Sequence, residues 1–240
     1  MKKYAIEAKN ISKKYSTVRA LENLNFNIEK GEVFGIAGPN AAGKSTFLSI
    51  IATVVRPSKG DAVIGGYSVV KNPQKVKPMI GYVPQETALY DKLSGYDNLN
   101  FWAGIYKISG RRRKKRIEEV AEITGIEQVL RRRVETFSGG MKKRLNIAVA
   151  LVHNPQILIM DEPTAGVDVI SRKLILQSVK QYSRSGRTVV FTSHYMDDMQ
   201  QVCDRALILD KGKEKASGSI EQLLHRYDAK RISDIMMKLE

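Results

Sequence analysis

The chain has 240 residues, of which 42% are hydrophobic and 27% are charged, a composition that indicates a soluble globular protein and excludes a disordered or fibrous one. No apolar run approaches the roughly 18 residues of a membrane span, the start from Met1 to Glu7 lacks the apolar stretch of a secretory signal, and the single cysteine, Cys203, suits a reducing cytosol. Lys and Arg number 40 against 25 Asp and Glu, and the net charge of +15 favours anionic partners: nucleotides, nucleic acid or acidic lipid.

The first third of the chain predicts short strands around one helix. Apolar runs bounded by turn residues predict strands at residues 4–8, 24–28, 33–37, 61–64 and 80–83. The helix is expected at 43–52, with Phe47, Leu48, Ile50 and Ile51 on its buried side. The two strands nearest the N-terminus are expected to form an antiparallel layer.

The middle of the chain predicts helices alone. From about residue 94 to residue 153 no strand pattern occurs, and Ser94, Ser109 and Ser138 each stand where a helix N-cap is expected. Strands return at residues 157–160, 188–192 and 206–209, with an amphipathic helix between the first two.

Short apolar strands separated by helices predict an α/β fold with a mostly parallel sheet covered on both faces. We therefore predict a single domain over residues 1–240. Its core is expected at about 1–86 and 154–226, a helical subdomain is inserted at about 87–153, and a helical tail occupies about 227–240.

A glycine-rich loop joins the strand predicted at 33–37 to the following helix. Its sequence, from Gly38 to Thr46, is GPNAAGKST. Polyphosphate carries several negative charges, and bare backbone N–H groups, a helix N-terminus and a lysine can enclose it closely. We expect Lys44 to reach the β- and γ-phosphates of a nucleotide and the Ser45 hydroxyl to bind Mg²⁺. An ordinary glycine turn is the weaker alternative.

Two carboxylates, Asp161 and Glu162, follow the strand predicted at 157–160. In an open α/β sheet, ligands bind beyond the carboxyl ends of the strands. We expect Asp161 to hold Mg²⁺, directly or through water, and Glu162 to polarise an attacking water as general base. Adjacent acids after a strand can also be a helix N-cap, an alternative that the phosphate loop weakens.

A second glycine-rich helix start is formed by Ser138, Gly139 and Gly140. Its bare N–H groups and positive dipole end suit an anion, although simple capping is the alternative. One chain would then hold two phosphate-binding helix starts and one lysine-bearing loop. Two chains pairing head to tail would explain this, with each nucleotide between the phosphate loop of one chain and the Ser-Gly-Gly of its partner.

These motifs, in this order, resemble the ATP-binding subunit of an ABC transporter over about residues 4–224. The Walker A motif corresponds to 38–45, the Walker B motif to 157–161 and the signature motif to 137–141. The resemblance implies a P-loop NTPase core that binds ATP and Mg²⁺ and works as an ATPase.

The resemblance also assigns roles to single residues. Gln85 matches the Q-loop glutamine, which senses Mg²⁺ and the transport subunit, and Asp168 matches the D-loop. His194 is placed like the switch histidine on the γ-phosphate, and Tyr15 like the aromatic residue that stacks on adenine. The residues expected to bind nucleotide are Tyr15, Val18, Gly38, Pro39, Asn40, Ala41, Ala42, Gly43, Lys44, Ser45, Thr46, Ser138, Gly139, Gly140 and Asp168. Those expected to act in catalysis are Glu162, His194, Lys44 and Gln85, and those expected to bind Mg²⁺ are Ser45, Gln85 and Asp161.

The sequence departs from the family's usual pattern at Ala41, where glycine is common, and at Met141, where many members have glutamine. Ser-Gly-Gly-Met followed by basic residues resembles the exporter branch, in which ATPase and permease are separate chains. The implied function is MgATP hydrolysis in a head-to-tail dimer, with a second copy or a homologous subunit, at the cytoplasmic face of the cell membrane. Hydrolysis would drive transport, in the export direction, by a separate integral membrane permease.

A related ATPase acting on nucleic acid or ribosomes is the alternative. Chromosome-structural members are disfavoured because Lys44 and Asp161 are too close in sequence for the long coiled coils that these members have. Translation-associated members are disfavoured because they carry two cassettes in one chain, whereas this chain holds one. A binding module without turnover is disfavoured because Glu162 and His194 are both present. Nucleic acid is not an expected partner, since the basic runs at 111–116 and 131–133 lack interleaved aromatics. These runs fit a solvated helix face, with acidic headgroups or nucleic acid as alternatives.

Overall fold

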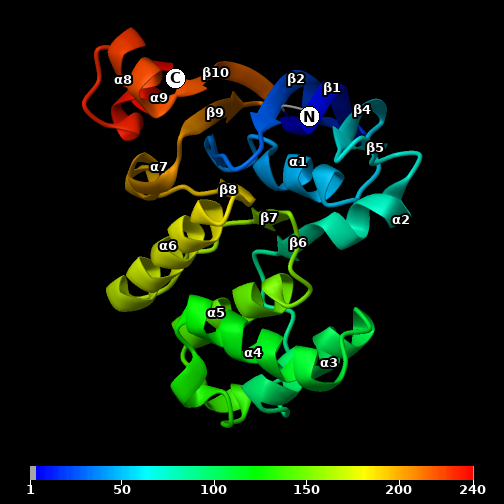
Figure 1. Ribbon diagram of the computed structural model, residues 1–240. Coiled ribbons are helices and arrows are strands. Elements are labelled where there is room, and N and C mark those ends of the chain that lie inside the picture. Colours follow the sequence, from blue (N-terminus) through cyan, green and yellow to red (C-terminus); the bar gives the residue numbers. More distant parts are fainter. Residues whose placement is uncertain (1–3, 240) are drawn as a thin grey trace.

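Two β-sheets and a lobe of helices form the protein in the computed structural model, which describes residues 4–239 (Figure 1). The strands are β1 (Tyr4–Tyr15), β2 (Val18–Glu29), β3 (Val33–Ala37), β4 (Lys59–Ile64), β5 (Tyr67–Ser68), β6 (Ile80–Val83), β7 (Ile157–Met160), β8 (Thr188–Thr192), β9 (Arg205–Asp210) and β10 (Lys213–Ser219). The α-helices are α1 (Lys44–Ile51), α2 (Pro73–Val76), α3 (Gly95–Ile105), α4 (Gly110–Thr124), α5 (Gly139–Leu151), α6 (Val169–Arg184), α7 (Met196–Val202), α8 (Ile220–Arg226) and α9 (Ile232–Leu239). Short 3₁₀ helices lie at Lys77–Met79, Glu127–Val129 and Val134–Thr136.

Two expectations fall partly outside the described residues. The expectation about a secretory signal concerns the start of the chain, of which residues 1–3 lie outside the described part. The predicted domain over residues 1–240 likewise includes residues 1–3 and 240, which are not described.

The larger sheet has the strand order β10-β9-β3-β8-β7-β6. Neighbouring strands from β9 to β6 are parallel, and β10 pairs antiparallel with β9 at the edge. The smaller sheet, β2-β1-β4-β5, is antiparallel throughout. Every residue of β3 and β8 is buried, because both faces of the parallel sheet are covered. The predicted α/β fold, with its N-terminal antiparallel layer, is confirmed.

Helix α1 lies between the two sheets (Figure 1). All four residues predicted on its inner side, from Phe47 to Ile51, are fully buried. They belong to one core cluster with Ile6 of β1 and Ile36 of β3, so the helix joins the two sheets. Its first turn is exposed at Ser45, which leaves the start of the helix facing solvent.

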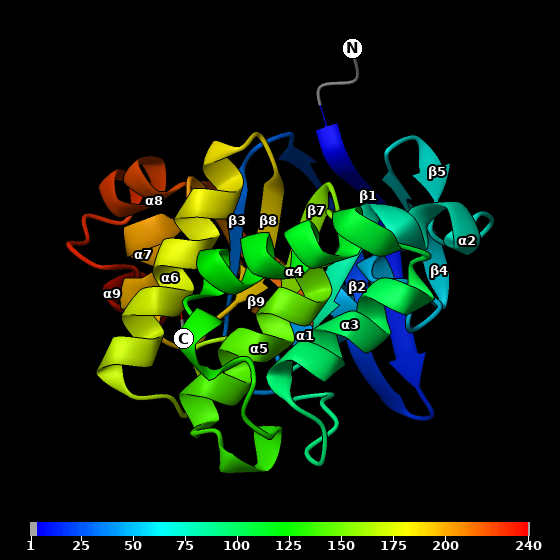
Figure 2. The same cartoon turned by 60° about the horizontal axis from the view of Figure 1, so that its bottom comes forward.

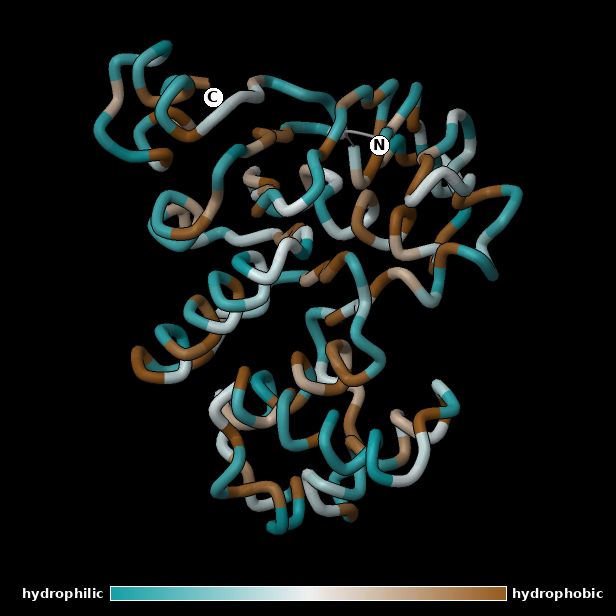
Figure 3. The backbone as a smooth tube through the Cα atoms, viewed as in Figure 1, coloured by the Kyte–Doolittle hydropathy of each residue, from teal (hydrophilic) through white to brown (hydrophobic). Residues whose placement is uncertain are grey.

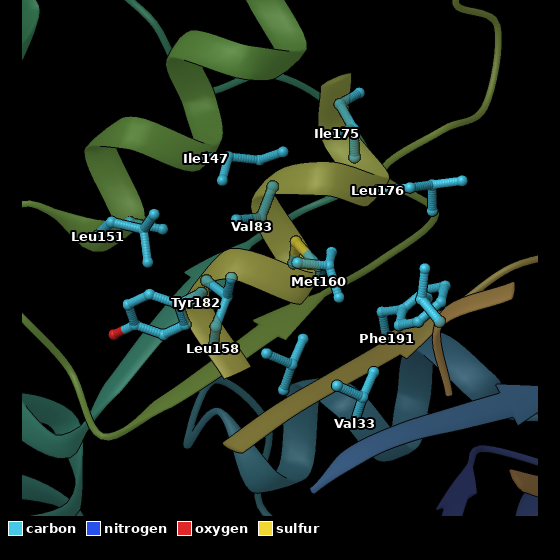
Figure 4. Close-up of a cluster of buried hydrophobic side chains, with 14 of the residues drawn as sticks. Val33, Val83, Ile147, Leu151, Leu158, Met160, Ile175, Leu176, Tyr182 and Phe191 are labelled. Carbon is cyan, nitrogen blue, oxygen red and sulfur yellow. The ribbon is translucent and has the colours of Figure 1, made fainter. Parts of the chain in front are cut away.

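The opposite face of the parallel sheet packs against α5 and α6. Figure 4 shows Leu158 and Met160 of β7 and Phe191 of β8 meeting Ile147 of α5 and Ile175 of α6. This second core joins the helical lobe to the sheet.

The helical lobe contains α3, α4 and α5 and forms the lower part of Figure 1, which comes forward in Figure 2. Two predicted N-caps make the expected bond: Ser94 Oγ accepts from Asp97 N at 3.0 Å, and Ser138 Oγ accepts from Met141 N at 3.2 Å. Ser109 is the N-cap of α4 but its side chain makes no capping hydrogen bond.

The strands of the smaller sheet are longer than the sequence predicts. β1 and β2 each have 12 residues, and their pairing shifts register between Ala8 and Ile11. Asn10 and Asn23 have positive φ angles of 53° and 51°. These irregularities interrupt the alternation of polar and apolar side chains by which a strand is recognised.

Two strands have no sequence prediction at all. β5 has two residues, and β10 is the polar segment KEKASGS. The predicted tail at 227–240 contains α9, whereas α8 lies before it; the subdomain boundaries remain a prediction. Among residues 4–239, the structure has no helix of the length and apolar character that a membrane crossing requires.

The packing of β6 on α5 generates a stability prediction. A Cβ at Gly81 would collide with the backbone oxygen of Ala150, whereas a Cβ at Gly104, within α3, would meet nothing within 4 Å. We expect Gly81→Ala to lower the free energy of unfolding by about 1–3 kcal/mol through overpacking. Gly104→Ala should raise it by roughly 0.5–1 kcal/mol, because alanine restricts the unfolded chain. Urea unfolding of both variants measures the two changes in unfolding free energy. Changes of the same sign would contradict the close packing of β6 on α5.

Candidate nucleotide site

The phosphate loop runs from the end of β3 to the start of α1 and curls around its own lysine. Lys44 Nζ donates to the carbonyl oxygens of Gly38 at 2.8 Å and of Pro39 at 2.9 Å. Lys44 is 5% exposed, and burial lowers the pKa of its ammonium, an effect opposed by the charges of Glu162 and Asp161. The ammonium group of Lys44 is thus held inside the loop by two backbone carbonyl oxygens. Its positive charge lies where the loop would enclose an anion.

Two glycines of the loop are required by close packing. Gly38 has φ 153°, and a Cβ there would collide with the Leu209 backbone oxygen of β9. Gly43 has φ 102°, and its Cβ would lie 2.5 Å from the Ala20 backbone oxygen of β2. The loop is therefore held against both sheets.

Ala41 adopts the left-handed conformation, with φ 63°. Its side chain is exposed, so the cost at this position is one of backbone conformation and not of space. The hydrogen bond from Gly212 N to Ala42 O, at 3.0 Å, secures the next residue to the β9–β10 turn. Contacts within the chain therefore hold the loop in its curled shape.

The two predicted carboxylates are fixed by a threonine on the adjacent strand. Thr192 Oγ1, at the end of β8, donates to Asp161 Oδ1 at 2.7 Å and accepts from Glu162 N at 3.0 Å. Glu162 has φ 47°, a conformation that non-glycine residues adopt at a cost and that often marks functional sites. The turn places Glu162 just beyond the carboxyl end of β7.

Two further predicted residues converge on Glu162. Gln85, after β6, places its Nε2 3.4 Å from Glu162 Oε2, and His194, after β8, places Nδ1 3.1 Å from the same oxygen. The strands β6, β7 and β8 are neighbours in the sheet, so their carboxyl ends bring the three side chains together.

A cleft of about 740 Å³ joins these groups to the tip of the β1–β2 hairpin. Its lining residues are Tyr15, Val18, Arg19, Ala20, Asn40, Ala41, Ala42, Gly43, Lys44, Ser45, Thr46, Gln85, Glu162 and His194. Tyr15 and Val18 face each other across the hairpin and are exposed, which leaves an apolar surface for a planar ring. Arg19 and Ala20 were not among the predicted residues.

The second glycine-rich helix start lies outside this cleft. Ser138 and Gly139 are exposed, and a Cβ at Gly140 would collide with the side chain of Ser171 in α6. Asp168 caps α6 by accepting from Ser171 N at 2.9 Å, and this bond lowers the pKa of the Asp168 carboxyl. The predicted signature and D-loop residues therefore lie beside each other, apart from the phosphate loop of the same chain.

Lys143 is a contact of the site that the sequence analysis missed. Its Nζ donates to the backbone oxygen of Gln85, so α5 is tied to the segment that carries the predicted Q-loop glutamine. Burial lowers the pKa of Lys143, and the charges of Asp161 and Glu162 oppose that shift. One lysine among several in a basic stretch gives no signal of such a contact.

Comparisons with known proteins agree with this geometry. A sequence profile described as ABC transporter matches residues 21–165. The linearmycin resistance ATP-binding protein LnrL of Bacillus subtilis (strain 168) is 45% identical over 221 residues, which are 92% of this chain and 71% of that protein.

Two solved structures are similar to the whole chain. The ATP-binding subunit of an ABC transporter matches with a TM-score of 0.88 and 26% identity, over 98% of this chain and 99% of that chain. A dimer of the ATP-binding cassette MJ0796, in a post-hydrolysis state bound to ADP and Pi, matches with a TM-score of 0.82 and 28% identity, over 90% of this chain and 98% of that chain.

The conformation of the loop leads to a prediction for Ala41. Left-handed alanine costs roughly 1–2 kcal/mol relative to glycine, and we expect this strain to be present already before a nucleotide binds, because contacts within the chain hold the loop. We therefore expect Ala41→Gly to change ATP affinity by less than about threefold and to leave ATPase activity in place. Calorimetric titration of both proteins with ATP measures it. An increase of about tenfold in the ATP affinity of the glycine variant would show that Ala41 weakens nucleotide binding.

The bond from Lys143 to Gln85 leads to a second prediction. We expect Lys143→Ala to lower kcat for ATP about tenfold with little change in KM, because the loop that presents Gln85 to Glu162 loses a charged hydrogen bond. The matched control is Lys142→Ala, whose side chain pairs with Asp91 at 2.9 Å on the surface and should change kcat less than about twofold.

A double variant distinguishes positioning from general damage. If Lys143 acts through Gln85, Lys143→Ala should add nothing to the loss already caused by Gln85→Ala. Equal losses in the two backgrounds would show that the lysine acts by another route.

Proposed function

The chain belongs to the ABC transporter family of ATPases, and on that premise we propose that it hydrolyses MgATP in a head-to-tail dimer that drives export by a separate membrane permease. The observation that carries the proposal is the position of Ser138, Gly139 and Gly140. This helix start suits phosphate but lies outside the cleft of its own chain, which supports a site where a second chain brings it to the nucleotide.

The residues of the cleft fit the triphosphate of ATP and Mg²⁺. The loop backbone, the start of α1 and the buried Lys44 provide the donors for phosphate oxygens. Residues 4–239 contain no group of three or more His, Cys, Asp and Glu side chains that could hold a metal ion. Mg²⁺ commonly takes one or two protein ligands together with phosphate oxygens, which suits the Ser45 hydroxyl and Asp161, with Gln85 nearby.

Glu162 is the proposed general base. Its Oε2 is the shared partner of Gln85 Nε2 and His194 Nδ1, so the carboxylate is held in the lining of the cleft that also contains Lys44. A water between Glu162 and the γ-phosphate would lose its proton to this oxygen. His194 and Lys44 would face the charge that develops on the phosphate, and Gln85 would orient the water and the metal.

The exposed start of α6 supports a dimer. Val169 and Ile170 follow Asp168 directly and are 83% and 73% exposed, beside the signature residues at the start of α5. Apolar side chains next to an incomplete phosphate site indicate a surface covered by a partner chain. The solved MJ0796 cassette, described as a dimer bound to ADP and Pi, is consistent with this arrangement.

An aromatic face of the helical lobe is the proposed docking surface for the permease. Tyr90 and Phe101 are exposed and meet edge to face with ring centroids 5.1 Å apart, and Leu93 is exposed beside them in sequence. The segment from Gln85 to Leu93 links this face to Glu162, so movement of the permease would shift Gln85 relative to the proposed catalytic carboxylate. In this arrangement the subunit is peripheral, at the cytoplasmic face of the cell membrane.

The export direction is supported by the name of a relative. LnrL is described as a resistance protein, and resistance through transport requires removal of the compound from the cell. In this arrangement the permease selects the substrate, so the identity of the exported compound is determined by the permease and not by this chain.

Mixing two inactive variants tests the head-to-tail site. Lys44→Ala removes the charge opposite the phosphates, and Ser138→Arg blocks the helix start offered to the partner chain. Each variant alone should lack ATPase activity. In a mixed dimer one site carries both lesions and the other carries neither, so mixing should restore part of the activity. Absence of recovery, with mixed dimers shown by differently tagged chains, would rule out the composite site.

A further inference from the structure

A cluster of cations, most of them without acidic partners, lies at the start of α4 and just before it. The α4 basic surface consists of Lys107, Arg111, Arg112, Lys114 and Lys115, all of them exposed. Lys115 lies 3.9 Å from Glu119, whereas the structure, over the residues it describes, records no ion pair for the other four side chains. These charges are therefore available to an external anion.

The distribution of charge along α4 differs from that of a solvated helix face. The first half of the helix holds the basic run 111–116, and its acids, Glu118, Glu119 and Glu122, all come later. Cations three or four residues apart repel one another, and cations at a helix start oppose the helix dipole. This distribution of charge destabilises α4, and the burial of residues such as Ile117 and Val120 stabilises it instead.

Apolar side chains adjoin the basic surface. Ile105 and Tyr106, at the end of α3, are 58% and 38% exposed and directly precede Lys107. The Tyr106 ring is fixed by stacking on His153, with ring centroids 3.8 Å apart. In Figure 3 hydrophilic and hydrophobic stretches alternate along the chain of this lower lobe. Cations next to exposed apolar side chains are the pattern of a membrane interface.

A hollow lies beside these cations. It has a volume of about 240 Å³ and is lined by Ile108, Arg112, Lys115, Arg116, Glu119, Val152, His153 and Asn154. Arg116 is fixed there, because its guanidinium donates to the backbone oxygens of Leu151 and Val152 and pairs with Glu119 at 2.8 Å. Arg112 and Lys115 remain exposed beside it, so the hollow presents cations to a headgroup phosphate.

We propose that the α4 basic surface, together with Ile105 and Tyr106, binds the anionic phospholipids of the membrane surface. The lipid would neutralise cations that lack partners within the protein, and the apolar pair would enter the interface between headgroups and acyl chains. Nucleic acid is disfavoured, because its grooves and phosphates give no reason for an exposed isoleucine beside the cations. The inference does not depend on the dimer or on the permease.

Vesicle co-sedimentation of the full chain tests the proposal. The vesicles are phosphatidylcholine alone or phosphatidylcholine with about one third phosphatidylglycerol. We expect binding to the anionic vesicles alone, weakening as salt is added. Replacing Arg111, Arg112 and Lys114 by Gln should lower the partition coefficient about a hundredfold, since each cation near an anionic membrane contributes about fivefold.

The matched control replaces Lys59, Lys71 and Lys77 by Gln. These lysines are exposed, carry the same total charge and lie on the side of β4 and α2. Partitioning of this control should change less than about threefold, and both triple variants should keep the basal ATPase activity. Equal losses in the two variants would show that net charge alone causes the binding, and unchanged binding of the α4 variant would also overturn the proposal.

Two competitors identify other anions. If millimolar inorganic phosphate displaces the vesicles, the hollow is a small-anion site and not a lipid site. If a single-stranded RNA binds more tightly than the vesicles at equal salt and the α4 variant loses that binding, the surface belongs to nucleic acid. Neither competitor should prevent vesicle binding if the proposal is correct.

Discussion

The burial of α1 between the two sheets determines where everything else in the site can lie. Its apolar residues contact β1 on one side and β3 on the other, so the helix cannot shift without opening both layers. The loop that precedes it must therefore turn within a space bounded by the backbone oxygens of Ala20 and Leu209. Glycine at positions 38 and 43 is the consequence of that space, and the curl around Lys44 follows from it.

A second constraint acts at the carboxyl edge of the parallel sheet. The hydroxyl of Thr192 binds Asp161 and the backbone of Glu162 at once, so two neighbouring carboxylates are pointed in different directions. The left-handed backbone of Glu162 costs conformational energy, and the hydrogen bond from its N–H helps to hold it. The division between a buried Asp161 and a more accessible Glu162 suits a metal ligand and a base, the roles proposed for them.

The helical lobe and the neighbouring start of α6 carry the surfaces that are proposed to contact other molecules. The starts of α5 and α6 are exposed side by side. The aromatic face is formed by Phe101 of α3 with Tyr90 and Leu93 before that helix, and the basic surface by the start of α4 with Lys107 before it. Lys143 connects this lobe to the segment of Gln85, and the core shared by α5, α6 and β7 connects it to the sheet. The start of α5 therefore has a short chain of contacts, through Lys143 and Gln85, to Glu162.

The sequence by itself determined most of the elements of the parallel sheet and the family. Strands β3, β6, β7 and β8 have the predicted bounds, because strands that are buried along most or all of their length are continuous apolar runs that end sharply at turn residues. The spacing of glycines and Lys44 likewise predicts the phosphate loop, since every residue expected to enclose a phosphate there is local in the chain.

Only the tertiary structure decided which distant residues meet. Gln85 and His194 reach one oxygen of Glu162 across 77 and 32 residues, because β6, β7 and β8 are adjacent in the sheet, and strand order is not encoded in any local pattern. β10 forms from a polar segment because β9 offers it an edge to pair with, which composition alone cannot indicate. The contact of Lys143 and the separation of Ser138 from the cleft depend in the same way on how helix and sheet pack, and not on the residues next to them in sequence.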